Sequence, residues 1–296
     1  MRLLRLASCY TMSRGREGRK NRLLTRAARK VVRSGRGEGV IVKVCVLASG
    51  SSGNCTLIAS QRTRVLIDVG LSRREVCQRL SAIGEDPQKL DAILVTHEHT
   101  DHVSGLPLLA RKFDIPVYMT HLAAPAVAFE GFRPKLETFQ AGTRLAIGDL
   151  EIDSFTIPHD AIDPVGYCVH SQGIKVGVVT DLGYVPDSLK FHLKGTHLLV
   201  LESNHDLEML KVGPYPWPVK QRVMGRKGHL SNESASEFIL RDMDSSTVTL
   251  VLAHLSEHNN HPELVRLVGR QALQQRGLET RLVVAEHRRQ TEVFRF

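Results

Sequence analysis

The chain has 296 residues, of which 42% are hydrophobic and 24% charged, a balance typical of a globular protein rather than a disordered one. No stretch approaches the roughly 18 consecutive apolar residues that a membrane-spanning helix requires. The formal net charge of +9 is concentrated in residues 1–39, which hold 12 basic and 2 acidic residues. Because the remainder is close to neutral, the charge of the whole chain is no argument for nucleic-acid binding.

Three interpretations of residues 1–39 remain open. An Arg-rich, acid-poor composition is shared by mitochondrial transit peptides and by disordered arms that contact phosphates. The segment could also derive from a start codon assigned too far upstream, because residues 40–296 need nothing from it. An export signal is disfavoured because Arg5 interrupts an already short apolar stretch. We expect residues 40–296 to form the folded domain.

The cysteines are odd in number and widely spaced, and none forms a Cys-x-x-Cys pair; they are Cys9, Cys45, Cys55, Cys77 and Cys168. This usage indicates a reducing compartment and no disulfide framework, so we expect a cytoplasmic protein.

The hydrophobic pattern predicts many short strands interrupted by a few helices. Strands are expected at 40–48, 55–59, 64–69, 92–96, 117–119, 143–147, 151–157, 165–170, 175–180, 197–201, 247–253, 282–285 and 292–296. Helices are expected at 73–83, with Ser72 as N-cap, at 103–113, 187–192 and 232–243, and from Pro262 to Gly277. Each half therefore consists of strands followed by helices. The arrangement that fits is an α/β (α+β) fold with two mixed sheets packed face to face and helices outside.

The most informative stretch is 94–102, where a short apolar strand leads into several histidines and acids. In an extended segment, residues two apart face the same way, so His97 and His99 can reach one cation. Asp101 and His102 follow where the chain turns into a helix, and they can reach a second cation. Such a polar cluster at the end of a buried strand is most simply compensated by metal coordination.

His97-x-His99-x-Asp101-His102 is similar to the signature of the metallo-β-lactamase superfamily, whose fold is a four-layer αββα sandwich with the metal site at one edge of its two sheets. Four further residues match other motifs of that superfamily: Asp68, His159, Asp181 and His254. More narrowly, the chain resembles the YycJ/WalJ group of cytosolic bacterial enzymes in stretches 47–54, 202–206, 228–232 and 254–260.

The resemblance implies a site with two divalent ions. His97, His99 and His159 would hold one ion, Asp101, His102 and His254 the other, and Asp181 would bridge both. Asp68 is expected to orient the histidine loop rather than to bind metal. The mixed set of imidazoles and carboxylates suits Zn²⁺ or Mn²⁺, and the ligand types do not decide between them.

A pair of ions about 3.5–4 Å apart suits the hydrolysis of phosphodiesters, because the ions hold a bridging hydroxide and clamp the attacking and leaving oxygens. A zinc β-lactamase often places a thiolate on its second metal, and no cysteine here matches a superfamily motif. We count Asp101 among the catalytic residues as well as the ligands. His229 resembles a general acid of related nucleases, with Glu202 as its carboxylate partner and His205 as the alternative acid.

Two segments are candidates for contact with substrate. Ser51, Ser52 and Asn54 lie in a turn that follows the first strand, and their polar groups could hold a phosphate; a plain hairpin turn is the alternative. Lys220 and Arg222 are expected in a Pro-rich loop near two aromatic residues, which suits a single nucleic-acid strand, although a solvated face explains the charges equally well.

The hypothesis is a dinuclear metal-dependent phosphodiesterase, with DNA as substrate and attack from a 5′ end implied by the resemblance alone. One alternative is a hydrolase of thioesters, lactones or cyclic nucleotides on the same metals. Another is a nucleic-acid-binding protein that uses the basic segment 1–39 and has a vestigial site.

Overall fold

Two seven-stranded β-sheets form the centre of the protein. The computed structural model describes residues 42–129 and 131–296, so the segment 1–39 lies outside the described residues. The first sheet has, in spatial order, strands β14 (Phe294–Arg295), β1 (Val42–Ala48), β2 (Cys55–Ser60), β3 (Arg64–Ile67), β4 (Ala92–Leu94), β5 (Val117–Thr120) and β6 (Leu136–Phe139). The second has β13 (Arg281–Val284), β12 (Thr249–Ala253), β11 (Leu198–Glu202), β10 (Ile174–Val179), β9 (Val165–Ser171), β8 (Leu150–Thr156) and β7 (Arg144–Ile147).

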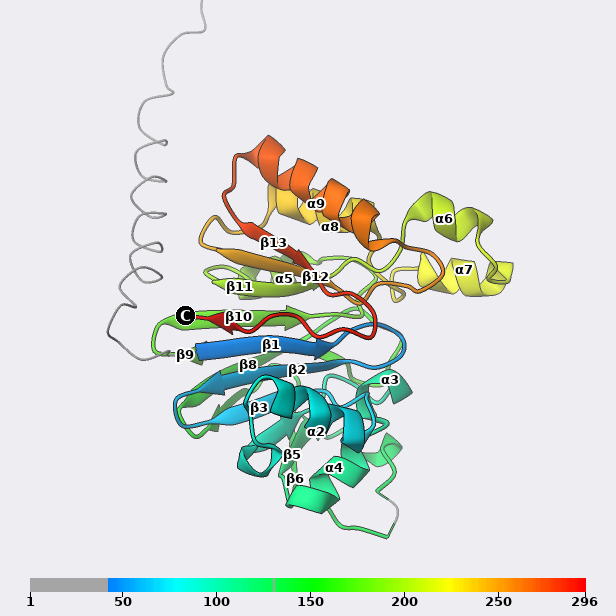
Figure 1. Cartoon of the computed structure of the whole chain (residues 1–296). Coiled ribbons are helices and arrows are strands. Elements are labelled where there is room, and N and C mark those ends of the chain that lie inside the picture. The colour runs from blue at the N-terminus through cyan, green and yellow to red at the C-terminus, as the bar shows by residue number, and fades with distance from the viewer. Residues whose placement is uncertain (1–41, 130) are drawn as a thin grey trace, which may run out of the picture.

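Helices cover the outer face of each sheet, which gives four layers (Figure 1). Helices α2 (Arg73–Ala82) and α4 (Leu106–Phe113) pack on the first sheet. Helices α5 (Asp187–His192), α8 (Asn232–Arg241) and α9 (Pro262–Arg276) pack on the second. The predicted αββα sandwich is therefore confirmed.

The sheets pack together because both inner faces are apolar. The core between them includes Val44, Ile58, Leu94, Tyr167 and Val251, all buried. Most strands also carry apolar side chains on their other face, which pack under the helices. Strands β3 to β6 are parallel, as are β10 to β13, and strands buried on both faces are typical of parallel sheets.

The parallel strands bring their carboxyl ends to one edge of the sandwich, which we call the metal edge. The opposite edge, the hairpin edge, holds the tight β2–β3 and β7–β8 turns. There Ser60 Oγ donates to Asp149 Oδ1 at 2.6 Å and joins the two sheets. Nearby, the buried carboxylate of Glu85 accepts from Lys43 Nζ at 2.8 Å and from Arg64 Nε at 2.9 Å.

The structure corrects several predicted elements. The helix predicted at 103–113 begins later, at Leu106, as α4, because the chain turns at Gly105 against the carbonyl of Leu71; a separate short helix, α3 (Thr100–Val103), precedes the turn. The Pro-rich stretch predicted as a loop contains two helices, α6 (Leu207–Val212) and α7 (Trp217–Val223). Strand β6 was not predicted, since three of its four residues are exposed.

The remaining elements are two 3₁₀ turns, η1 (Pro87–Lys89) and η2 (Ala124–Ala126). Ser72 caps α2 as predicted, accepting from the backbone N–H of Glu75. Across the described residues, none of the helices combines the length and apolar character needed to cross a bilayer.

Candidate metal centre

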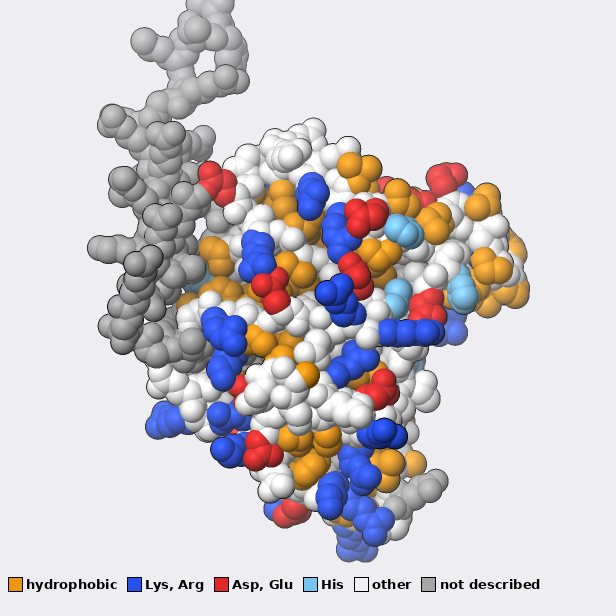
Figure 2. All heavy atoms as spheres, viewed as in Figure 1, with side chains coloured by type: hydrophobic (Ala, Val, Ile, Leu, Met, Phe, Trp, Pro, Cys, Tyr) orange, Lys and Arg blue, Asp and Glu red, His pale blue; other side chains and the backbone are white. Residues whose placement is uncertain are grey.

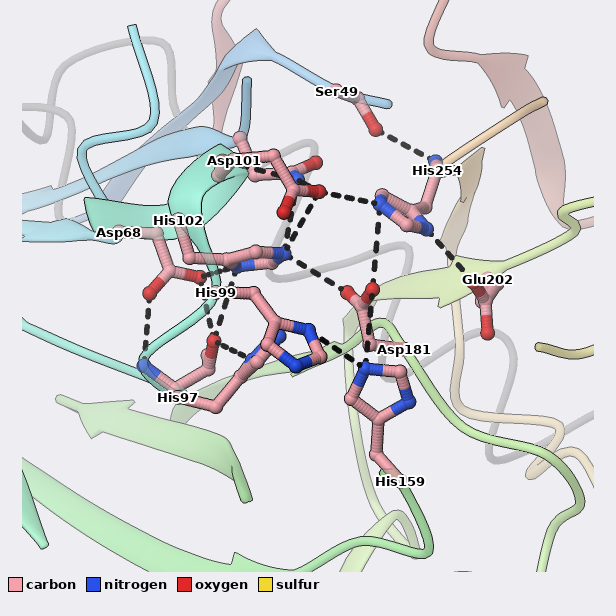
Figure 3. A network of polar contacts seen from close by, with 12 residues as sticks. Ser49, Asp68, His97, His99, Asp101, His102, His159, Asp181, Glu202 and His254 are labelled. Atoms are coloured by element: carbon pink, nitrogen blue, oxygen red, sulfur yellow. Dashed lines mark hydrogen bonds and ion pairs between the residues drawn. The ribbon is translucent and has the colours of Figure 1, made fainter. Parts of the chain in front are cut away.

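The sequence-predicted ligands converge at the metal edge from both sheets (Figure 3). The first sheet supplies four of them from the loop after β4 and from α3: His97, His99, Asp101 and His102. The second sheet supplies three from the loops that follow β8, β10 and β12: His159, Asp181 and His254.

Three functional residues that follow strands have left-handed backbones. The φ angles are 62° at Asp68, 61° at Asp181 and 55° at His254. A non-glycine residue with such a φ is uncommon and costs about 1–3 kcal/mol when the surrounding structure enforces it. Each of these turns directs a polar side chain toward the common site directly after a strand ends.

The first cluster consists of His97, His99 and His159, whose candidate ligand atoms all lie within 4.8 Å of one another. His97 is buried, and its Nε2 has no hydrogen-bond partner among the described residues. Burial lowers the pKa of His97 well below its usual value, so its ring stays neutral. A buried neutral imidazole without a partner is a donor suited to a cation.

The second cluster consists of Asp101, His102, Asp181 and His254, again within 4.8 Å. Asp181 Oδ2 lies 3.3 Å from His102 Nε2, and Asp181 Oδ1 lies 3.4 Å from His254 Nε2 and 4.0 Å from His159 Nε2. Asp181 therefore lies between the two clusters. Its burial raises its pKa, but His254 and His102 outweigh burial, and the net pKa lies well below the usual value. This donor set of imidazoles and carboxylates fits a pair of divalent ions.

Asp68 supports this cluster from beneath. Its Oδ2 accepts from His102 Nδ1 at 2.8 Å and from Thr96 Oγ1 at 2.9 Å, while its Oδ1 accepts from the Thr96 backbone N–H at 2.8 Å. The contact to Nδ1 leaves Nε2 of His102 directed at the site. Fixing a ligand's tautomer and orientation in this way raises metal affinity.

Sequence reasoning missed several supporting contacts that depend on tertiary approach. Ser49 Oγ accepts from the backbone N–H of His254 at 2.7 Å. Asn204 Nδ2 donates to the His254 carbonyl at 2.8 Å, and Nδ1 of His159 lies 3.2 Å from the carbonyl oxygen of Gly228. Ser49 and Asn204 belong to family-like stretches of the sequence, which was the available signal.

Glu202 contacts both the candidate ligand His254 and a further histidine, His229. Its Oε1 lies 2.8 Å from Nδ1 of His229 and 2.8 Å from Nδ1 of His254, and its Oε2 accepts from the backbone N–H groups of Leu182 and Leu230. Burial raises the pKa of Glu202, but the two histidines outweigh it and bring the pKa to about 2. Burial lowers the pKa of His229, but Glu202 raises it above the usual histidine value. His229 can therefore carry a proton beside the metal clusters.

His205 does not fit the role of alternative acid. It is 1% exposed, and burial lowers its pKa to about 4, so its ring is neutral near neutral pH. Glu202 contacts His229 rather than His205. The geometry favours His229 over His205 as proton donor.

The turn after β1 contains one residue that supports the candidate metal site and two residues that are exposed. Asn54 is buried, its Oδ1 accepts from the Gly50 backbone N–H, and its Nδ2 lies 3.0 Å from His102 Nε2 and 3.3 Å from Asp101 Oδ2. This contradicts the expected role of Asn54 in binding substrate, because its amide is used within the site. Ser51 and Ser52 are exposed and remain candidate substrate contacts.

Lys220 and Arg222 lie on helix α7 rather than in a loop. Lys220 is buried and its ammonium donates to the carbonyl of Lys211 at 2.7 Å, so the expected substrate contact of Lys220 is wrong. Arg222 is exposed and pairs with Asp160, the residue after His159, at 2.5 Å.

The comparison with known proteins agrees with this fold and site. A family model described as the beta-lactamase superfamily domain matches residues 63–254. Together with the sandwich and the clustered ligands, this match shows the class: the chain belongs to the beta-lactamase superfamily and is a metal-dependent hydrolase.

Particular relatives show more closely which proteins the chain is similar to. The chain is 39% identical to exodeoxyribonuclease YycJ of Bacillus anthracis, over 78% of this chain and 89% of that protein. It is 36% identical to exodeoxyribonuclease WalJ of Streptococcus pneumoniae, over 76% of this chain and 86% of that protein. In structure, it resembles the metallo-beta-lactamase fold protein YhfI of Bacillus subtilis with a TM-score of 0.67 and 18% identity, covering 87% of this chain and all of that one.

Proposed function

We propose that this chain is a dinuclear metal-dependent phosphodiesterase, namely a DNA exonuclease that acts from a 5′ end. The relatives named exodeoxyribonuclease support the substrate, since they match the chain over most of their length. The observation that carries the proposal is the position of Asp181 between two ligand clusters, with the His229–Glu202 pair beside them.

His97, His99 and His159 would hold one Zn²⁺ or Mn²⁺ ion, and Asp101, His102 and His254 the other, with Asp181 shared. When bound, two such ions supply an activated water and neutralise the charge that develops on a phosphodiester. The other parts of the chemistry belong to the protein's own side chains.

His229 delivers a proton to the leaving oxygen of the cleaved strand. Nδ1 of its ring is held by Glu202, so the proton is delivered from Nε2. Glu202 keeps the ring oriented and charged. Ser51, Ser52 and Arg222 lie on exposed segments beside the ligands, and they contact the phosphates of the strand.

We further propose that the protein works in a reducing compartment, the cytoplasm. The four cysteines of the described residues are all free thiols: Cys45, Cys55, Cys77 and Cys168.

A substrate panel tests the proposal. Zn²⁺- and Mn²⁺-loaded protein is assayed on single-stranded DNA, RNA, a bis-aryl phosphodiester and an acyl thioester, and the bound metal is quantified. We expect release of nucleotides from DNA, with a 5′ label released before a 3′ label. Turnover of the thioester without cleavage of DNA would overturn the nuclease and favour a small-molecule hydrolase.

A further inference from the structure

Helices α6 and α7 and the turns around them, residues 207–228, form an arm that projects from the metal edge (Figure 1). Its tip is apolar and exposed: Val212 is 85% exposed, Trp217 59% and Val219 39%. Figure 2 shows hydrophobic side chains gathered at this projecting end. Exposed apolar side chains grouped in this way mark a binding surface more often than isolated ones do.

The tip is held in place rather than loosely attached. Prolines 214, 216 and 218 flank Tyr215 and Trp217, and Pro216 is the N-cap of α7. A proline fixes φ, so three of them restrict the backbone around Trp217. The Tyr215 ring packs edge-on against His258, and Lys220 joins α7 to α6 through the carbonyl of Lys211. Trp217 is thus presented at a defined position.

The arm is joined directly to catalytic residues. It begins a few residues after Glu202 and ends immediately before His229. Arg222 pairs with Asp160 next to the ligand His159, and the Gly228 carbonyl contacts the ring of His159. A nucleic-acid strand bound along α7 would therefore lead to the metal clusters.

The charge of the arm indicates what kind of molecule it binds. Residues 207–228 contain five basic residues and one acidic residue, whereas residues 40–296 as a whole are close to neutral. Lys211 pairs with Glu208, and the Arg226 guanidinium lies 4.1 Å from the Tyr184 ring centroid. A second copy of the chain would bring two cationic arms together, so the charge favours a polyanion with apolar faces.

We propose that the arm is a stacking platform for single-stranded DNA, with Trp217 packed against a base and Arg222, Arg226 and Lys227 along the phosphates. Combining an aromatic side chain with a cationic track is a general means of holding a single strand without reading its sequence. The inference rests on the proposed function, because it assigns the path by which the substrate reaches the metals.

The chain has a single tryptophan, so its own fluorescence reports on the platform. The full, metal-loaded chain is titrated with a phosphorothioate oligodeoxynucleotide, which resists cleavage. We expect quenching of the Trp217 emission, and no quenching by an abasic oligonucleotide of equal length, which has the charge but no bases.

Variants give the second measurement, namely affinity by anisotropy of a labelled strand. Trp217→Ala should weaken binding on the order of ten-fold, and Trp217→Phe should retain most of it, because phenylalanine can still stack. Phe191→Ala is the matched control. Phe191 is also exposed, at 70%, but it lies on α5, away from the metal edge. Its neighbour His192 shows this position, because the His192 carbonyl accepts from Lys175 at the amino end of β10. This variant should bind as the unchanged protein does.

Two results would overturn the platform. In the first, DNA binds while the Trp217 emission and the affinity of Trp217→Ala stay unchanged. In the second, the emission depends on protein concentration and sedimentation shows a dimer that Trp217→Ala dissociates, so that a second copy covers the tip. Cleavage is scored separately: quenching without any DNA cleavage supports the platform and rejects the nuclease, and cleavage without quenching does the reverse.

Discussion

The buried polar groups at the two edges of the sandwich differ in their partners. At the hairpin edge, the carboxylate of Glu85 accepts from both Lys43 and Arg64, and Ser60 Oγ donates to Asp149 Oδ1 across the sheets. At the metal edge, His97 Nε2 and Asp181 Oδ2 are buried without a hydrogen-bond partner among the described residues.

The buried polar groups named at the hairpin edge support the fold, whereas those at the metal edge are candidate metal ligands. A buried polar atom without a partner costs about 1–3 kcal/mol. At the metal edge such atoms belong to two candidate ligands and lie beside left-handed residues, whereas at the hairpin edge the unpartnered Asp149 Oδ2 lies 3.6 Å from Arg62 Nε. We expect the metal edge to be completed by divalent metal from outside the chain, whereas the Glu85 carboxylate at the hairpin edge is paired within the chain. Substitutions at the two edges should therefore have opposite signatures.

The largest effect is expected from Asp181→Asn, which keeps a side chain that tolerates the left-handed backbone but removes the shared charge. Metal content should fall below two ions per chain. Loss of metal-ion catalysis is worth several kcal/mol, or about a thousand-fold in turnover. Added Zn²⁺ should raise the melting temperature of the variant by less than it raises that of the unchanged protein. Full metal content in the variant, measured by elemental analysis, would contradict the position given to Asp181.

His229→Ala should separate catalysis from metal binding within the metal edge. A general acid contributes on the order of a hundred-fold or more, so kcat on DNA should fall by about that factor. Metal content should stay normal if His229 is the proposed acid, whose Nδ1 lies 2.8 Å from Glu202 Oε1, and not a ligand. Loss of metal in this variant would show that His229 is a ligand.

Asp68→Asn should have an intermediate effect, because the amide has one acceptor oxygen, whereas the carboxylate accepts at Oδ2 from Thr96 Oγ1 and His102 Nδ1 and at Oδ1 from the Thr96 backbone N–H. We expect metal affinity to weaken by about 10- to 100-fold, measured by competition with a chromophoric chelator. Saturating metal should restore most of the activity. Activity that stays lost at full metal occupancy would give Asp68 a role in the reaction itself.

Glu85→Gln should have the smallest effect on activity and a clear effect on stability. Burial raises the pKa of Glu85, but Lys43 and Arg64 outweigh it, and the net pKa lies below the usual 4.5. The carboxylate therefore stabilises the fold above that pH, and its contribution is lost as the pH falls through the lowered value. The free energy of unfolding should fall by about 1–3 kcal/mol at neutral pH and by less in acid.

The control for that measurement is the increment that Zn²⁺ adds to the melting temperature. It should be the same in Glu85→Gln as in the unchanged protein. A reduced increment would mean that the two edges are coupled through the sheets.

The convergence of the candidate ligands could be predicted from the sequence because the histidine motif is local and the other candidates match motifs of the superfamily that it resembles. His97 and His99 alternate at the end of an apolar strand, and Asp181 follows another. Contacts such as Ser49 to His254 could not be predicted, since they join residues about two hundred positions apart. The exact pairing depends on how two sheets pack, and no local pattern encodes that.

Proline misled the prediction of the arm. Pro216 and Pro218 indicate a loop, yet one is the N-cap of α7 and the other lies in its first turn, where the missing N–H has no partner to lose. The helix predicted at 103–113 is present as α4, but its start was predicted three residues too early. Its apolar spacing is continuous, and the close approach of Gly105 to the Leu71 carbonyl sets the start of the helix.

The candidate ligands come from both sheets, so a bound pair of ions would link the two halves of the chain. A cut between β6 and β7 would leave His97, His99, Asp101 and His102 on one fragment and His159, Asp181 and His254 on the other. Neither fragment alone has the ligands for the full site. We expect co-expressed fragments to reassociate far more tightly with Zn²⁺ than with a chelator, which size-exclusion chromatography would reveal.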